Sequence, residues 1–132
     1  MGPDSSMPGR GRASEPVVHV ELLPPRERDF AAIVSLRGEH DLASAPEVSS
    51  AIAGIEGNVL VDLADCTFLD STVIAVLFAR SADLERAGRF LEVVVPRENV
   101  PITRTLELVR MRDVIVVHEV RPSRDLGSST GA

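Results

Sequence analysis

Apolar and polar positions along the chain form blocks that predict short strands separated by helices. Apolar runs rich in β-branched residues predict strands at residues 17–23, 30–36, 58–63, 90–95 and 114–118. Helical spacing and helix start signals predict helices over about 44–54, 71–88 and 101–110. The order β-β-α-β-α-β-α-β predicts an α/β domain with a largely parallel sheet and one edge strand that runs against it.

Three of these segments carry stronger local signals. Ser44 stands before Pro46 and Glu47, which predicts a capping box with Ser44 as the N-cap residue. The run at 58–63 is continuously apolar rather than alternating, so we expect it to be buried on both faces of the sheet. From Ser71 the apolar positions follow helical spacing, which predicts the longest helix in the chain.

Composition separates the two ends from the middle of the chain. Residues 1–16 and 121–132 contain few apolar groups, which predicts disordered tails on either side of one domain at 17–120. The net charge of the chain is −6 at pH 7, and residues 17–120 contain 17 acidic residues against 10 arginines. The acidity therefore belongs to the predicted domain.

The residue types present exclude several functions. All fourteen basic residues are arginine, and without lysine the chain has no P-loop, no pyridoxal Schiff base and no protein-kinase active site. It also has no Trp or Tyr and an acidic balance, so we expect no direct nucleic-acid partner.

The single cysteine and the hydropathy pattern predict a cytoplasmic location. Cys66 can form neither an internal disulfide nor a Cys-based zinc site, and we interpret it as a small buried residue in a turn. The N-terminal segment lacks the apolar core of a signal peptide, and no apolar run approaches the roughly 18 residues that span a bilayer. No membrane partner is expected, and the oligomeric state is left open.

Two acidic loops follow predicted strands, where sites form in parallel α/β sheets. One contains Asp41 and the other, residues 62–70, ends at Asp70 just before the hydroxyls of Ser71 and Thr72. The amides and partial positive charge of a helix N-terminus can accommodate a phosphoryl group on Ser71. Helix caps prefer the same residue types, and local chemistry alone favours that simpler role for Asp70 or Ser71.

Three segments, in the same order and separation, resemble the successive motifs of STAS domains, specifically those of anti-sigma factor antagonists. They are Leu36–Asp41, Val59–Ser71 and Thr105–Val109, and the resemblance covers nearly all of residues 17–120. The strand-loop-helix motif that ends in Asp-Ser is the most specific of the three. The resemblance implies a STAS-like, mixed and largely parallel sheet with helices packed against it.

The resemblance also implies a function. It is that of a regulatory protein, not an enzyme, which needs no cofactor, binds an anti-sigma factor with serine kinase activity and so releases a sigma factor. In that family the hydroxyl after the motif Asp is phosphorylated by the partner, which makes Ser71 the expected phosphoacceptor and Thr72 the second choice. The expected partner contacts are Asp41, Asp70, Ser71, Thr72 and Val73.

This chain departs from the family pattern at two motifs. The usual Asp-Ser-x-Gly-Leu-Gly has Val73 and Ala75 in place of its glycines, and the usual Leu-Thr-Gly-Leu has Arg110 in place of its glycine. Glycine lets a partner approach the helix start closely, so Val73 predicts altered partner choice or reduced phosphorylation. The alternative function is therefore a STAS interaction scaffold that is not phosphorylated, or a small-ligand sensor.

Other acidic and histidine residues suggest competing sites. Asp62, Asp65 and Asp70 are the residue types of a magnesium site or a phosphoaspartate receiver, but a receiver needs lysine and Asp62 falls within a predicted strand. The histidines are far apart in sequence, and ordinary surface or packing roles are favoured over a metal site or a catalytic triad. No metal site is expected, and no nucleophile–base pair indicates an enzyme.

Overall fold

The computed structural model describes residues 15–24 and 29–122. The tails predicted at 1–16 and 121–132 lie almost entirely outside the described residues. In chain order the elements are β2 (Val17–Leu22), β3 (Phe30–His40), α2 (Ala45–Ala53), β4 (Asn58–Asp62), β5 (Cys66–Leu69), α3 (Ser71–Arg86), β6 (Leu91–Val94), α4 (Val100–Leu108), the 3-10 helix η1 (Met111–Asp113) and β7 (Val117–His118).

The strands form one mixed sheet in the order β2-β3-β4-β6-β7, and β5 lies off this path, where it pairs with the last residues of β3. Only β2 runs antiparallel to its neighbour among the described strands, and the other pairings are parallel. The predicted α/β class, the largely parallel sheet and the reversed edge strand are therefore confirmed. In the part of the chain that the structure describes, no helix is long and apolar enough to cross a membrane.

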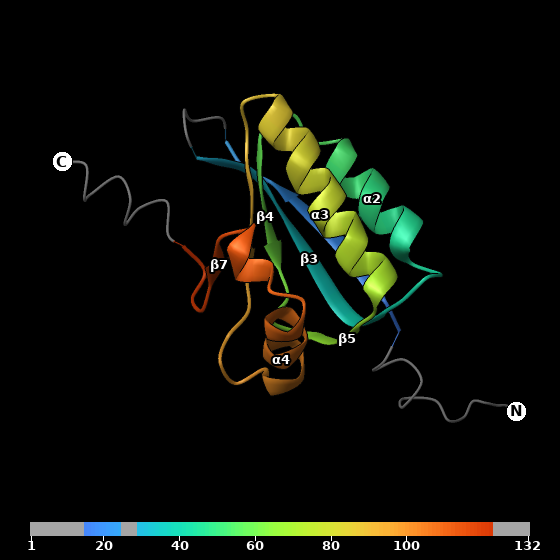
Figure 1. Ribbon diagram of the computed structural model, residues 1–132. Helices are drawn as coiled ribbons and strands as arrows, with labels where there is room; N and C mark the ends of the chain where they lie inside the picture. Colours follow the sequence, from blue (N-terminus) through green and yellow to red (C-terminus); the bar gives the residue numbers. More distant parts are fainter. Residues whose placement is uncertain (1–14, 25–28, 123–132) are drawn as a thin grey trace, which may run out of the picture.

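The core lies between the sheet and the helices α2 and α3, which lie side by side over one face (Figure 1). Alternate residues of β4 point into this core and into a smaller cluster on the opposite face. Val59 and Val61 pack in the main core, whereas Leu60 packs with Ile33 and Val94. The continuous apolar run of β4 is thus buried on both faces, as its lack of alternation predicts.

Strand β5 and the extension of β3 differ from the sequence-based expectation. We expected a loop over 62–70, but Cys66–Leu69 pair in parallel with the last residues of β3. Strand β3 itself continues to His40 rather than ending at Leu36. Both additions are short and only partly buried, so they carry no long apolar run for a pattern to detect.

The expected capping box at Ser44 is wrong. Ser44 occupies the N-cap position of α2, but its side chain makes no capping hydrogen bond. The hydroxyl instead accepts from the backbone N–H of Asp41 at 3.2 Å and lies 3.0 Å from Nδ1 of His40. The last strand is also shorter than expected, because the backbone forms η1 and turns before β7 begins at Val117.

Candidate functional site

The carboxyl ends of β3 and β5 bring the two acidic loops together. His40 pairs with Leu69 at the ends of these parallel strands, and the N–H of Asp70 donates to the carbonyl of His40 at 3.1 Å. Asp41 follows His40 and Asp70 follows Leu69 in the sequence. The two loops therefore start from adjacent positions in the sheet, although Asp41 and Asp70 are 29 residues apart in sequence. β5, which the sequence pattern does not reveal, is the element that fixes this arrangement.

Asp70 is the N-cap of α3. Its Oδ1 accepts from the backbone N–H of Thr72 at 3.0 Å and of Val73 at 3.1 Å, and its own backbone is extended. The simpler role expected of this motif is therefore confirmed for Asp70. Since this carboxylate caps the helix, the hydroxyl of Ser71 is released from that task.

Ser71 is exposed at the first position of α3, and Thr72 next to it is half-buried. Within the described residues, the Ser71 hydroxyl makes no hydrogen bond. It lies at the positive end of a sixteen-residue helix, where the dipole favours an added negative charge. The position can therefore accept a phosphoryl group without displacing a structural hydrogen bond.

Val73 has no exposed surface and packs in the main core. Its side chain points away from the surface that Ser71 presents, so its methyl groups fill the interior rather than the approach to the helix start. Ala75, which replaces the second glycine of the family motif, is exposed.

Asp41 closes a tight turn between β3 and α2. Its Oδ1 accepts from the N–H of Ala43 at 2.9 Å, and its carbonyl accepts from the N–H groups of Ser44 and Ala45. The side chain is exposed in this geometry. The turn therefore holds the carboxylate of Asp41 at the surface, on the loop adjacent to Asp70.

His40 contacts this turn from the interior of the domain. The ring is fully buried, and its Nε2 lies 3.0 Å from the carbonyl oxygen of Arg37 and 3.2 Å from that of Val17. Because a carbonyl only accepts, Nε2 is a donor, while Nδ1 meets the Ser44 hydroxyl. His40 has the expected packing role, and it connects the edge strand β2 to the Asp41 turn.

Two large apolar side chains are exposed beside these loops. Leu42 follows Asp41 and is 69% exposed, and Phe68 precedes Leu69 in β5 and is 49% exposed. The sequence analysis singled out neither residue, because a lone apolar residue in a loop has no distinguishing pattern. Exposed apolar residues bordered by polar groups mark surfaces that bind other proteins.

Asn99 holds the β4–β5 loop against α4. Its side-chain amide donates to the carbonyls of Leu63, Ala64 and Cys66, the last at 2.8 Å, and its Oδ1 caps α4 at the N–H of Ile102. Asn99 is not among the residues predicted from the sequence. The order Asn-x-Pro at 99–101 indicates a helix cap, but it does not indicate the three contacts with the β4–β5 loop.

Cys66 has the buried role expected of it. The residue is 1% exposed, and its Sγ donates to the carbonyl of Phe68 at 3.3 Å. Burial raises the pKa of the Cys66 thiol from an ordinary 9.0 to about 11. The thiol is therefore protonated at neutral pH and is a poor nucleophile.

The three acids considered for a metal site have separate partners. Asp62 is buried and accepts from Nε of Arg121 at 3.2 Å, Asp65 lies 4.0 Å from Nε of Arg37, and Asp70 caps α3. Among residues 15–24 and 29–122, no group of three or more His, Cys, Asp and Glu side chains could hold a metal ion.

The profile of the STAS domain family matches residues 24–126, and the chain belongs to this family. Its fold is similar to that of two solved anti-sigma factor antagonists. One, from Mycobacterium paratuberculosis, has 22% identity and a TM-score of 0.65, with 89% of this chain and 94% of the other covered. The second, SpoIIAA in its unphosphorylated form, has 16% identity and a TM-score of 0.59, with 88% and 100% covered. No curated protein matches the chain significantly in sequence.

Proposed function

We propose that this STAS domain is an anti-sigma factor antagonist. It binds an anti-sigma factor that is also a serine kinase, releases a sigma factor, and is inactivated by phosphorylation at Ser71. The observation that carries the proposal is the division of roles at the start of α3, where Asp70 caps the helix and the Ser71 hydroxyl is exposed without a structural hydrogen bond in the described residues. Membership of the family and the fold shared with two antagonists support it.

The proposed contact surface combines polar and apolar groups around Ser71. It contains the previously expected Asp41, Asp70, Ser71 and Thr72, and the exposed side chains of Leu42 and Phe68. Val73 is left out because its side chain is buried. The two apolar residues provide area to bury against a partner, and the acids provide charge that a basic partner surface recognises.

Phosphorylation acts on this surface directly. A phosphate on Ser71 adds a charge of about −1.5 to −2 between the loops of Asp41 and Asp70. The end of α3 stabilises that charge within the free domain, but a partner surface that fits the unmodified hydroxyl meets added bulk and an altered potential. The interface is lost without a rearrangement of the fold. Because the reaction consumes ATP, we place the protein in the cytoplasm.

A scaffold that is never phosphorylated is the second candidate, and Ala75 is the observation that favours it. Its exposed methyl group lies one turn beyond Ser71, where the usual glycine of the family leaves the helix surface open. A kinase that needs close contact with the first turn of α3 is obstructed there.

Phosphorylation by a bound anti-sigma kinase tests the proposal. A purified kinase-type anti-sigma factor that forms a complex with the chain is incubated with it and ATP, and the site is mapped by mass spectrometry. We expect one phosphoryl group on Ser71, none in Ser71→Ala, and unchanged modification in Thr72→Val. A complex that forms but leaves the wild-type chain unmodified would support the scaffold instead.

Binding of variants to the same partner tests the charge mechanism. We expect Ser71→Asp to weaken the complex by about tenfold or more, the equivalent of roughly 1.4 kcal/mol, whereas Ser71→Ala binds like the wild type. Ser50→Asp places the same charge on the exposed side of α2 and serves as the matched control. Equal affinities for the two Asp variants contradict the mechanism.

A further inference from the structure

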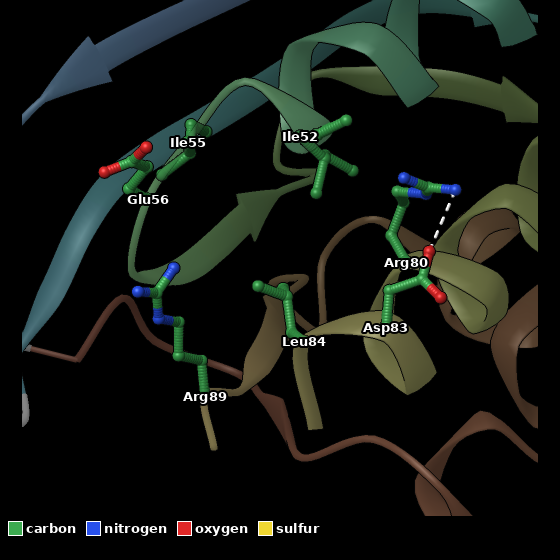
Figure 2. Close-up of a pocket in the computed structure, with 8 residues that line it drawn as sticks. Ile52, Ile55, Glu56, Arg80, Asp83, Leu84 and Arg89 are labelled. Atoms are coloured by element: carbon green, nitrogen blue, oxygen red, sulfur yellow. Dashed lines mark ion pairs between the residues drawn. The ribbon is translucent and has the colours of Figure 1, made fainter. Parts of the chain in front are cut away.

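A pocket of about 220 Å³ lies between α2 and α3, towards their C-terminal ends (Figure 2). Ser71 is at the opposite, N-terminal end of α3. Eight residues line the pocket: Ile52, Ala53, Ile55, Glu56, Arg80, Asp83, Leu84 and Arg89. None of them belongs to the contact surface proposed above. The pocket is thus a separate feature of the domain, and nothing in the proposed function accounts for it.

The floor and the rim of this pocket differ in chemistry. The side chains of Ile52, Ile55 and Leu84 are largely buried and form an apolar floor. Charged residues stand on both sides of it, with Glu56 and Arg89 on one side and Arg80 and Asp83 on the other (Figure 2). Apolar walls with a few convergent polar groups are characteristic of sites for small molecules.

The two arginines of the rim have unused hydrogen-bonding capacity. Arg80 forms an ion pair with Asp83 at 2.9 Å, but its Nε is buried and has no acceptor within the described residues. Arg89 forms no ion pair in the same part of the chain, and its guanidinium group reaches towards the pocket from the loop after α3 (Figure 2). The Arg80 Nε is buried and does not open into the pocket, so Arg89 is the guanidinium group that the pocket offers to an acceptor.

We propose that this pocket binds a small organic carboxylate with a branched apolar body. The carboxylate would accept from the guanidinium group of Arg89, whose planar geometry matches its two oxygens. The apolar body would pack on Ile52, Ile55 and Leu84. This inference does not rest on the proposed function, since it concerns another part of the surface.

Size and charge restrict the ligand class. The volume is below the roughly 300–1,000 Å³ of pockets that enclose drug-sized molecules, which excludes nucleotides. The rim carries two acids as well as two arginines, so its net charge does not favour a multivalent anion such as phosphate. A monovalent anion with an apolar body makes use of both the floor and Arg89.

A titration with 4-methylpentanoate, followed by amide chemical shifts in the full chain, tests the proposal. We expect saturable shifts at Ile52, Ile55 and Leu84, the residues of the floor. The uncharged 4-methylpentan-1-ol has the same apolar body and should bind about tenfold more weakly or worse, because it lacks the charged acceptor. No saturable shift at these residues at millimolar probe, or equal binding of acid and alcohol, overturns the inference.

A pair of arginine variants completes the test. Arg89 is exposed, so Arg89→Gln keeps the fold and should weaken binding of 4-methylpentanoate by about tenfold. Arg104→Gln removes an equally exposed arginine from α4, outside the pocket, and should bind like the wild type. Equal losses in the two variants would show that the probe responds to net charge alone. That result would also overturn the inference and would leave phosphorylation of Ser71 untouched.

Discussion

Asp70 and Ser71 are adjacent residues with different roles. The carboxylate of Asp70 is committed to the amides of α3, and the hydroxyl of Ser71 faces outward. The cap is therefore what keeps Ser71 at a fixed place at the start of the helix. Loss of the cap and loss of the Asp70 charge are separable changes, because an amide oxygen can replace a carboxylate oxygen as a hydrogen-bond acceptor.

We predict that Asp70→Ala lowers the free energy of unfolding by about 1 kcal/mol, since the N–H groups of Thr72 and Val73 lose their acceptor. Asp70→Asn keeps an acceptor oxygen at the same position and should remain within about 0.5 kcal/mol of the wild type. Urea unfolding at neutral pH measures both. Equal losses in the two variants would mean that charge at the helix end, not capping, stabilises α3.

Local sequence predicted the positions of Asp41, Asp70 and Ser71 at strand ends, but not the contacts that hold these residues there. Asp41, Asp70 and Ser71 follow strand ends, and sites in parallel sheets form at such ends. The contacts of Asn99 and of His40 were not predictable, because each joins segments that are distant in sequence. Ser44 shows the same limit, since a buried ring competes with the backbone for its hydroxyl.

The backbone takes the same left-handed conformation after α3 and after α4, at a glycine in one case and at an arginine in the other. Gly88 follows α3 with φ 76°, and Arg110 occupies the corresponding place after α4 with φ 57°. Each donates its N–H to a carbonyl three residues earlier, Glu85 and Glu107 respectively. The glycine that the family motif has at this second position is absent, but the backbone keeps the left-handed conformation that glycine favours.

We predict opposite effects of exchanging these residues. Arg110→Gly should stabilise the domain by about 0.5 kcal/mol, because relief of the left-handed strain exceeds the entropy cost of glycine and the loss of an exposed pair with Asp113. Gly88→Arg should destabilise it by about 1 kcal/mol. A Cβ at position 88 meets nothing within 4 Å, so the loss there is conformational. Thermal or urea unfolding that gives both changes the same sign contradicts this account.

At the level of elements, apolar patterning predicted the strands that form the core and failed for those that shape the site. β5 has two exposed residues in four, and one of them is the apolar Phe68; its pairing partner is the polar end of β3, where the buried residues are Gly38 and His40. Apolar residues therefore do not consistently coincide with buried positions in these segments, and patterning does not detect them. The register between β3 and β5 depends on tertiary packing with α4, which contacts β5.

The composition of the whole molecule leaves one side chain to titrate at alkaline pH. The chain has no lysine or tyrosine. Arginine loses its proton only above about pH 12, and an α-amino group loses its proton near pH 8. Between these limits only Cys66 changes charge, and burial raises the pKa of its thiol from 9.0 to about 11. The change of folding stability with pH in this alkaline range therefore reports the ionisation of the Cys66 thiol.

We predict that the free energy of unfolding is constant from neutral pH to about pH 9 and then falls by about 2 kcal/mol by pH 11. The unfolded chain loses the thiol proton first, so the stabilisation is fully present below pH 9.0 and is lost as the pH rises through the folded-state pKa of about 11. Urea unfolding under reducing conditions measures this. Cys66→Ala should show no such decline, and the same slope in both proteins would assign it to another group.

The ion pair between Asp62 and Arg121 has a consequence for where the folded unit ends. Asp62 lies at the end of a central strand with its carboxylate largely buried, and Arg121 reaches it from beyond β7. A chain cut after residue 120 keeps every described strand and helix, yet it leaves a buried anion without its cation, which is a costly arrangement. The boundary of this domain is thus set by charge compensation rather than by its last strand.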